Sequence, residues 1–205
     1  MKTTATIISL LLTISVTFAQ PTETYYDDGS TRSQGDLKNG KKEGEWKFYY
    51  PNGTLQATEN YSKDQLNGVV LSYDFDGNLQ SREQWQEGTL QDTAIYYYPN
   101  NRIKRKGAYR DGQYEGVWVD YYPSGIIKRS LEYSSGQPNG EWRYYSEKGV
   151  LIQKGFYQNG MENGHWEFYS KKGKLKFKGE YLNGKRTGEW IQVNGNKEKP
   201  YDYHQ

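Results

Sequence analysis

The 205-residue sequence contains no cysteine and only two histidines, and apolar residues make up 34% of it. Without cysteine, the chain can form neither disulfides nor thiolate metal sites, and its N-terminus cannot carry a lipid on a cysteine. Beyond residue 19, no stretch approaches the about 20 consecutive apolar residues that a transmembrane helix needs. The formal net charge of +2 is too small to predict nucleic acid or a membrane surface as a partner.

The first nineteen residues differ in composition from the rest. Lys2 is followed by a short apolar stretch, Ile7–Val16, and the polar region begins directly after Ala19. A basic start, a short apolar run and a small residue at its end predict a secretory signal peptide over residues 1–19. We therefore expect an exported protein, periplasmic or secreted from a bacterium, with a single mature domain over residues 20–205.

Aromatic residues are abundant, with 21 Tyr, 6 Trp and 6 Phe. They recur with a period of 24 residues and without insertion or deletion, and the clearest unit is Gly140–Asn163. One position of the period holds Trp46, Val70, Ala94, Trp118, Trp142, Trp166 and Trp190. Most of the glycines also keep fixed positions, which a disordered chain has no reason to do. The sequence therefore predicts a repeat array.

Each unit is predicted to form a β-hairpin. Short connections such as Pro51–Gly53 separate runs rich in aromatic and β-branched residues, and they favour a type I turn closed by a left-handed residue. Asn101 stands at the closing position in one unit, and Asn is the residue that best replaces Gly where φ is positive. The second run alternates in polarity, as in Leu175–Tyr181, so one of its faces is buried and the other is solvated.

A single hairpin of this size is marginally stable, so the units must stack edge to edge. The prediction is an all-β fold: an elongated, twisted antiparallel sheet of about seven stacked β-hairpins over residues 25–194, with a tail, 195–205, that protects the last edge. Strand glycines on the buried parity leave room for an aromatic ring of a neighbouring strand; these are Gly107, Gly155 and Gly179. Trp142 and Tyr145 have opposite parity, which leaves open whether both faces are partly covered or a bulge changes the phase.

The recurring G-x-W-x-x-Y-Y-x-x-G-x-L, followed by G-x-Y-x-x-G, resembles the MORN-repeat variant family, whose bacterial members are often labelled antitoxin-like proteins of the YwqK type. The resemblance covers about residues 25–194 and implies an elongated sheet of hairpins. MORN repeats in general are linked with membrane association and with scaffolding of protein partners. An antitoxin role does not fit an exported protein, which cannot neutralise a cytoplasmic toxin. The second repeat departs from the pattern at Val70 and Asp74, and the third at Asp92 and Ala94.

We expect no catalytic residue, no metal and no cofactor. His165 occupies a variable position of the repeat, and His204 lies in the tail. No motif places a serine or a carboxylate beside a base, so nucleophilic catalysis has no support. Carboxylate pairs such as Glu59 and Glu83 are expected by chance among 25 acidic residues, which leaves a glycoside-acting enzyme as a remote alternative.

Two sets of residues are candidate binding surfaces. The basic stripe occupies two nearby positions of equal parity in the second run, which should align on one face; it consists of Lys104, Lys106, Lys128, Lys154, Lys176 and Lys178. The apolar patch stands where the outer units carry charged residues; it consists of Val69, Leu71, Ile95, Val117 and Val119. The stripe is either a solvated face or a docking surface for anionic lipid headgroups or lipopolysaccharide phosphates. The patch is a binding surface for a partner or a second copy if it is exposed, and core if the twist of the sheet covers it.

The recurring Trp and Tyr are better explained as core than as a ligand platform, because a single sheet has little else to bury. An ordered ladder of rings can also stack on sugars, however. The sequence predicts an exported, non-enzymatic repeat scaffold that mediates protein–protein interaction at the cell envelope. The alternative is a module that binds cell-wall glycan, anionic lipid or lipopolysaccharide.

Overall fold

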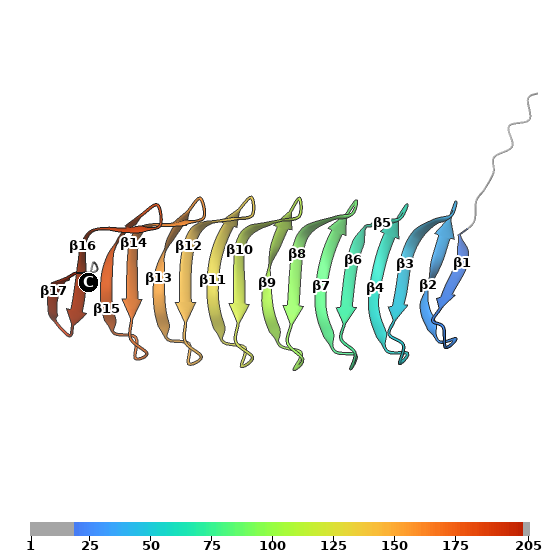
Figure 1. Ribbon diagram of the computed structural model, residues 1–205, viewed down its shortest axis with the longest axis horizontal. Coiled ribbons are helices and arrows are strands. Elements are labelled where there is room, and N and C mark those ends of the chain that lie inside the picture. The colour runs from blue at the N-terminus through green and yellow to red at the C-terminus, as the bar shows by residue number, and fades with distance from the viewer. Residues whose placement is uncertain (1–18, 203–205) are drawn as a thin grey trace, which may run out of the picture.

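The computed structural model describes residues 19–202, and it folds them into one open antiparallel sheet (Figure 1). The strands are β1 (Gln20–Tyr25), β2 (Thr31–Lys38), β3 (Lys41–Tyr49), β4 (Leu55–Ser62), β5 (Gln65–Leu66), β6 (Gly68–Tyr73), β7 (Leu79–Gln86), β8 (Thr89–Tyr97), β9 (Ile103–Arg110), β10 (Gln113–Tyr121), β11 (Ile127–Ser134), β12 (Gln137–Tyr145), β13 (Leu151–Gln158), β14 (Met161–Tyr169), β15 (Leu175–Leu182), β16 (Lys185–Asn194) and β17 (Lys197–Tyr201). The predicted signal peptide, apart from Ala19, lies outside the described residues, as does His204.

The strands pair in the order of the chain, so that β1 and β17 lie at opposite ends of an elongated row (Figure 1). The two-residue strand β5 is the one irregular element: it pairs with β4, which also pairs with β6. The predicted all-β sheet of stacked hairpins is confirmed.

Two kinds of turn alternate along the sheet. In the turn Tyr50–Thr54, the amide of Gly53 donates to the carbonyl oxygen of Tyr50 at 2.9 Å, and Gly53 has a φ of 81°. Asn101 takes the same position with a φ of 62°, as its place in the repeat predicts. The return turns, such as Asn159–Gly160 with φ of 50° and 80°, are two-residue turns of type I′.

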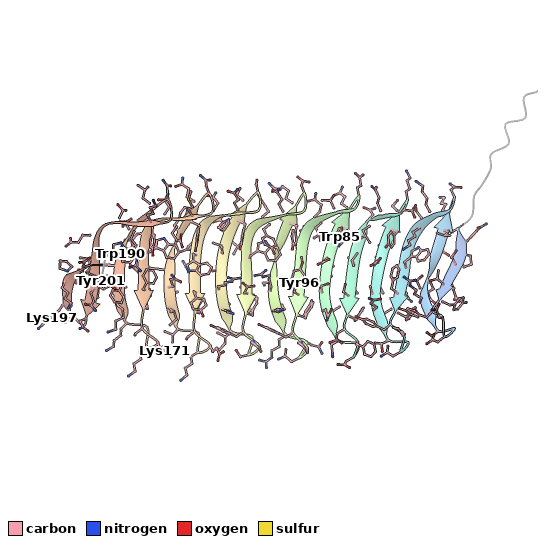
Figure 2. All side chains as sticks on the ribbon, viewed as in Figure 1. Trp85, Tyr96, Lys171, Trp190, Lys197 and Tyr201 are labelled. Carbon is pink, nitrogen blue, oxygen red and sulfur yellow. The ribbon has the colours of Figure 1, made fainter. Side chains whose placement is uncertain are left out.

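The register divides the sheet into two faces, because residues paired across antiparallel strands point to the same side. One side, here the aromatic face, carries the most buried residues: Trp46, Val70, Ala94, Trp118, Trp166 and Trp190, all from one position of the repeat. The opposite side, here the outer face, carries Ile95, Lys106 and Val119, which pair with one another in register. The register shift between Tyr144 and Tyr145 is a bulge in the second strand of the hairpin, because Tyr144 pairs with Gln153 and Tyr145 with Leu151, which leaves Ile152 as the extra residue. Trp142 and Tyr145 therefore point to opposite faces of the sheet. Side chains project from both faces of the single sheet (Figure 2).

Tryptophan rings of the aromatic face lie directly on strand glycines. A Cβ added to the glycine would meet the indole Cδ2 at 2.4 Å in Gly35–Trp46, 2.2 Å in Gly107–Trp118, 2.1 Å in Gly155–Trp166 and 2.4 Å in Gly179–Trp190. The prediction that these glycines make room for a ring is therefore confirmed. The indole nitrogen of Trp118 also donates to the carbonyl oxygen of Ala108 at 3.0 Å. A bulge accommodates the ring, since Glu115 pairs with Ala108 and Val119 with Lys106, so that residues 116–118 lie opposite Gly107 alone.

The C-terminal tail supplies an edge strand. Strand β17, which contains the labelled Lys197 and Tyr201, pairs with β16 (Figure 2). The ring of Tyr201 lies 4.8 Å from that of Phe177. The strand contains Lys197, Lys199 and Pro200, which discourage another chain from pairing with the edge.

Candidate functional site

Apolar and basic side chains alternate across the middle of the outer face. Leu71 pairs with Arg82, Arg82 with Ile95, Ile95 with Lys106, and Lys106 with Val119. We call these five residues the central row. Residues 19–202 form only this one sheet, so no second layer covers the row.

The other two members of the apolar patch lie on the same face. Val69 pairs with Gln84, and Val117 pairs with Glu132. Each valine lies two residues before a member of the central row, Leu71 or Val119, in the same strand. The side chain of Val117 is 57% exposed, whereas Leu71, Ile95 and Val119 are half-buried. The patch is therefore brought together on one uncovered surface.

Charges on this face are distributed unevenly. Towards the C-terminal end, three cations in the middle of the strands have an acidic neighbour; the pairs are Arg143–Glu141 at 2.6 Å, Lys154–Glu167 at 2.8 Å and Lys178–Glu198 at 2.8 Å. In the central row, by contrast, no carboxylate among residues 19–202 lies within ion-pairing distance of Arg82 or Lys106. The ammonium of Lys106 instead lies 5.9 Å from the centre of the Tyr121 ring.

The basic stripe does not lie on one face, which corrects the expectation from equal parity. Tyr96 pairs with Arg105 and Tyr97 with Ile103, so the bulge leaves Lys104 without a paired residue and turns it to the aromatic face. There its ammonium lies 6.0 Å from the centre of the Tyr98 ring.

The other lysines of the stripe follow the same division. Lys128 lies in the equivalent bulge, with its ammonium 5.6 Å from the centre of the Tyr122 ring, and Lys176 has the equivalent bulge position in β15. Lys106, Lys154 and Lys178 remain on the outer face. Parity counting fails at these bulges because two residues of one strand lie opposite one residue of the other.

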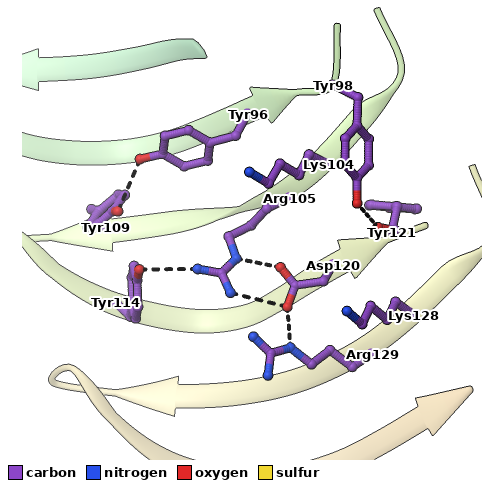
Figure 3. Close-up of a pocket in the computed structure, with 10 residues that line it drawn as sticks. All are labelled: Tyr96, Tyr98, Lys104, Arg105, Tyr109, Tyr114, Asp120, Tyr121, Lys128 and Arg129. Atoms are coloured by element: carbon purple, nitrogen blue, oxygen red, sulfur yellow. Dashed lines mark hydrogen bonds and ion pairs between the residues drawn. The ribbon is translucent and has the colours of Figure 1, made fainter. Parts of the chain in front are cut away.

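A cavity of about 550 Å³ opens on the aromatic face between β8 and β11 (Figure 3). Asp120 lies at its centre with a side chain that is 17% exposed. Arg105 donates to it through Nε and through Nη2, the latter at 3.2 Å, and Arg129 donates through Nε. Burial alone would raise the pKa of Asp120, but the hydrogen bonds and charges of Arg105 and Arg129 outweigh burial and lower it. Asp120 is therefore a stable anion between two guanidinium groups.

Tyrosines form the rest of this cavity. The hydroxyl of Tyr114 accepts a hydrogen bond from Arg105 Nη1 at 3.5 Å, and those of Tyr96 and Tyr109 lie 3.2 Å apart. Burial is the main cause that raises the pKa values of Tyr96 and Tyr109, so both remain neutral phenols.

Sequence reasoning missed the Asp120 cluster. The signal was present in the repeat: Asp120 occupies the position that holds Phe48 and Phe168 in other units, and Arg105 and Arg129 occupy that of Ala57. Charged residues at positions where every other unit carries an uncharged side chain mark a local site, whereas charges at solvated positions do not.

The remaining polar candidates form no catalytic arrangement. His165 lies on the outer face with Nδ1 at 2.8 Å from Glu180 and Nε2 at 3.4 Å from Glu167. Glu59 accepts a hydrogen bond from the hydroxyl of Tyr61, and Glu83 accepts one from the indole of Trp85 at 3.2 Å. Residues 19–202 contain no group of three His, Asp or Glu that could hold a metal ion. Nor does this part of the chain contain a helix of the length and apolarity needed to cross a bilayer.

The solved structures that match the chain have low identity and low TM-scores. Crystal structures of TcdB2-TccC3-Cdc42 and of TcdB2-TccC3 are 12% and 13% identical, with TM-scores of 0.23 and 0.22; 89% of this chain is covered in each case, and it spans only 14% and 15% of theirs. A protein of unknown function from Bacteroides fragilis is 11% identical, with coverage of 91% and 90% and a TM-score of 0.13. These values carry no functional argument. No curated protein matches the chain.

The family assignment is more informative. Five segments match the MORN repeat variant: residues 42–63, 66–87, 114–135, 138–159 and 162–183. The unmatched stretch between residues 87 and 114 contains the departures at Asp92 and Ala94. MORN repeats are typically non-catalytic and generally mediate protein or membrane interactions. Since five segments of 22 residues make up 110 of the 205, more than half, and each lies on the repeated hairpins, the chain belongs to the MORN-repeat variant family.

Proposed function

We propose that this chain is an exported, non-enzymatic scaffold that binds a protein partner at the bacterial cell envelope through its outer face. The observation that carries the proposal is the central row, in which Leu71, Ile95 and Val119 alternate with two cations that lack an acidic neighbour. The row lies on an uncovered sheet, so it is accessible as it stands.

The chemistry of the row favours a partner with both apolar and acidic side chains. Burying the three apolar side chains against a partner would remove them from water, at about 25 cal/mol per Å² of apolar surface. Carboxylates of the partner would pair with Arg82 and Lys106, which gives orientation and faster association. An interface with an apolar centre and charged groups that fix its register is typical of protein–protein contacts.

The division of the basic stripe weakens the alternative of an anionic lipid surface. Lys104, Lys128 and Lys176 lie on the opposite face from Lys106, so a flat membrane cannot meet all of them. Lys154 and Lys178 are already paired with glutamates. A protein partner that covers the central row needs none of these residues except Lys106.

Export is part of the proposal and rests on the composition of residues 1–19. It is tested by fractionation of a bacterium that expresses the full chain, with a variant that carries Leu11→Arg and Leu12→Arg as a control. We expect the wild type outside the cytoplasm and shortened by residues 1–19, and the variant retained at full length. A wild type that remains cytoplasmic and uncleaved would refute export.

The outer-face proposal is tested with a photo-crosslinking residue placed at position 95, and in a separate protein at position 191. Ile191 occupies the same position of the repeat at the C-terminal end, so it is a matched control. We expect one envelope protein to be crosslinked from position 95 and not from position 191.

The crosslinked protein is then purified, and its affinity is measured for the wild type, Ile95→Lys and Ile191→Lys. We expect Ile95→Lys to weaken binding at least tenfold with an unchanged melting temperature, and Ile191→Lys to have little effect. Equal loss in both variants, or loss that accompanies unfolding of Ile95→Lys, would refute the central row as the interface. Crosslinking of the chain to itself would show that a second copy is the occupant.

A further inference from the structure

The cavity on the aromatic face has an excess of positive charge. Arg105 and Arg129 share a single carboxylate, that of Asp120. Lys104 and Lys128 also line the cavity, and no carboxylate among residues 19–202 lies within ion-pairing distance of either. Among the residues that line the recess, four cations therefore face one anion, and the two lysines are left without an ion pair within residues 19–202.

Asp120 holds the two arginines in fixed positions. It lies on β10, between Arg105 on β9 and Arg129 on β11, and both guanidinium groups donate to it (Figure 3). Arg129 uses only Nε in this contact, so its two terminal nitrogens make no hydrogen bond within residues 19–202. Those nitrogens are donors held ready beside the cavity, and a guanidinium binds phosphate or carboxylate through such parallel donors.

The walls suit a ligand with a ring or an apolar body. The rings of Tyr109 and Tyr114 lie 5.2 Å apart, and Tyr96 and Tyr98 complete the recess (Figure 3). A volume of about 550 Å³ lies within the about 300–1,000 Å³ typical of small-molecule sites. A recess of this kind admits a small molecule more readily than a flat surface such as a membrane.

The equivalent cavity two repeats nearer the N-terminus shows that the scaffold itself does not require these charges. About 420 Å³ opens on the same face beside Phe48, and there Gln56 and Gln80 take the positions of the two lysines while Ala57 takes that of the arginines. No lysine or arginine lines it. The charges are therefore a property of one place in the array and not of the repeat.

We infer that the cavity around Asp120 is a binding site for a small ligand with at least two negative charges, of the phosphate or carboxylate class. Arg129, Lys104 and Lys128 hold the charged groups, and the tyrosine rings contact the body of the ligand. The site lies on the opposite face from the central row, so it is independent of the protein interface proposed above.

The test is calorimetric titration of the purified protein with four probes: inorganic phosphate, glucose 1-phosphate, citrate and vesicles that contain an anionic phospholipid. Glucose serves as the uncharged control. We expect glucose 1-phosphate or citrate to bind with an affinity that falls as salt rises, and inorganic phosphate to bind more weakly because it lacks a body. Saturation by vesicles alone, or no heat from any soluble probe, would overturn the inference.

Two double variants of equal charge identify the site. Lys104→Gln with Lys128→Gln introduces the glutamines found in the equivalent cavity beside Phe48, and Lys154→Gln with Lys178→Gln removes two lysines from the outer face. We expect the first pair to weaken probe binding more than tenfold and the second to change it less than twofold. Equal effects of the two pairs would show that net charge, and not this cavity, attracts the anions. The variant Ile95→Lys is expected to bind the probes with the affinity of the wild type. The anion site and the protein interface are therefore tested independently of each other.

Discussion

The central region of the sheet, β6–β11, and its C-terminal region, β13–β16, have the same backbone arrangement but different side chains packed on the aromatic face. In the C-terminal region, Trp166 and Trp190 are 1% exposed and cover Gly155 and Gly179. In the central region, two of the three equivalent positions hold small residues instead, Val70 and Ala94. The repeat positions that hold Gly155 and Gly179 there hold Glu59 and Glu83 here, so Val70 and Ala94 do not lie over a glycine as Trp166 and Trp190 do.

Around Asp120, hydrogen bonds and ion pairs accompany the packed rings of the central region. Asp120 stands where the C-terminal region has Phe168, and it is bonded to Arg105 and Arg129. The hydroxyls of Tyr96 and Tyr109 contact one another beside it. The turns and the register are common to both regions, so they define the fold, whereas the filling is free to vary. The stability of the C-terminal region therefore depends mainly on the packing of large rings, whereas that of the central region also depends on the charges around Asp120.

The largest difference is expected for removal of the core side chain. Trp166→Ala should lower the free energy of unfolding by about 3–5 kcal/mol, because the ring is fully buried and meets Tyr157 at 5.4 Å and Tyr181 at 5.5 Å. Ala94→Gly at the equivalent central position should lower it by about 1 kcal/mol, which is mainly backbone entropy. Urea unfolding of both variants measures the difference. Losses of similar size would show that the two regions are filled in the same way after all.

The next largest loss of stability is expected when a side chain is added to the glycine beneath Trp166. Gly155→Ala should destabilise by about 1–3 kcal/mol, because the new Cβ would lie 2.1 Å from Trp166 Cδ2 and the ring would have to move. In the central region, Glu83→Ala shortens a side chain beside Ala94 and should have a much smaller effect.

A double-mutant cycle isolates this contact. With Trp166→Ala already in place, Gly155→Ala has no ring to displace and should be close to neutral. Urea unfolding of the two single variants and the double variant gives the coupling energy. Additive losses would contradict a direct steric contact between the two residues.

Much of the fold follows from the sequence, because the period fixes which residues are equivalent. Seven aligned copies show which positions always need a turn residue, and so the positive φ of Asn101 and the space above Gly155 could be predicted before any coordinates. The alternation in the second strand likewise gives its buried face. These features repeat, and repetition is what an isolated sequence can reveal.

The binding surfaces were less predictable, because they depend on bulges and cross-strand register. A bulge moves Lys104 to the face opposite Lys106, although the two are separated by one residue. The cluster of Asp120 joins residues 15 and 9 positions away in the chain, which only the register places side by side. Counting alternate residues along one strand reveals neither the position of a bulge nor the register between strands.

Acid should weaken the hydrogen bonds of the Asp120 cluster and leave the contacts of the Trp166 ring unchanged. The folded pKa of Asp120 is lowered, so its ionisation stabilises the fold above its ordinary value of 3.8, and this contribution is lost as the pH falls through the folded value. At pH 7, Asp120→Asn should lower the free energy of unfolding by about 1.5–3 kcal/mol, the range for hydrogen bonds to a charged group.

The pH dependence of the difference is the informative measurement. The stability gap between the wild type and Asp120→Asn should narrow below about pH 4, as the wild-type carboxyl gains its proton. The gap for Trp166→Ala should change little over the same range, because no ionisable group is removed. Thermal melts of the three proteins between pH 7 and pH 3 measure both gaps. A constant gap for Asp120→Asn would show that its carboxylate contributes shape and not charge.

The smallest expected effect concerns the turns. In the central region the hydroxyl of Tyr98 donates to the carbonyl oxygen of Tyr121 in the next unit at 2.8 Å, whereas Ser170 accepts a hydrogen bond at 3.2 Å from Lys174 in its own turn. Tyr98→Phe and Ser170→Ala should each cost about 0.5–1.5 kcal/mol in net stability, so global unfolding alone will not distinguish them.

Hydrogen exchange will distinguish the two variants, because loss of the tyrosine hydroxyl loosens two units at once and loss of the serine hydroxyl loosens one. We therefore expect faster exchange in both β8–β9 and β10–β11 for Tyr98→Phe, but only around residues 170–174 for Ser170→Ala. If exchange in Tyr98→Phe increases only within its own hairpin, the central turns are as independent as the C-terminal ones, and the two regions differ in their filling alone.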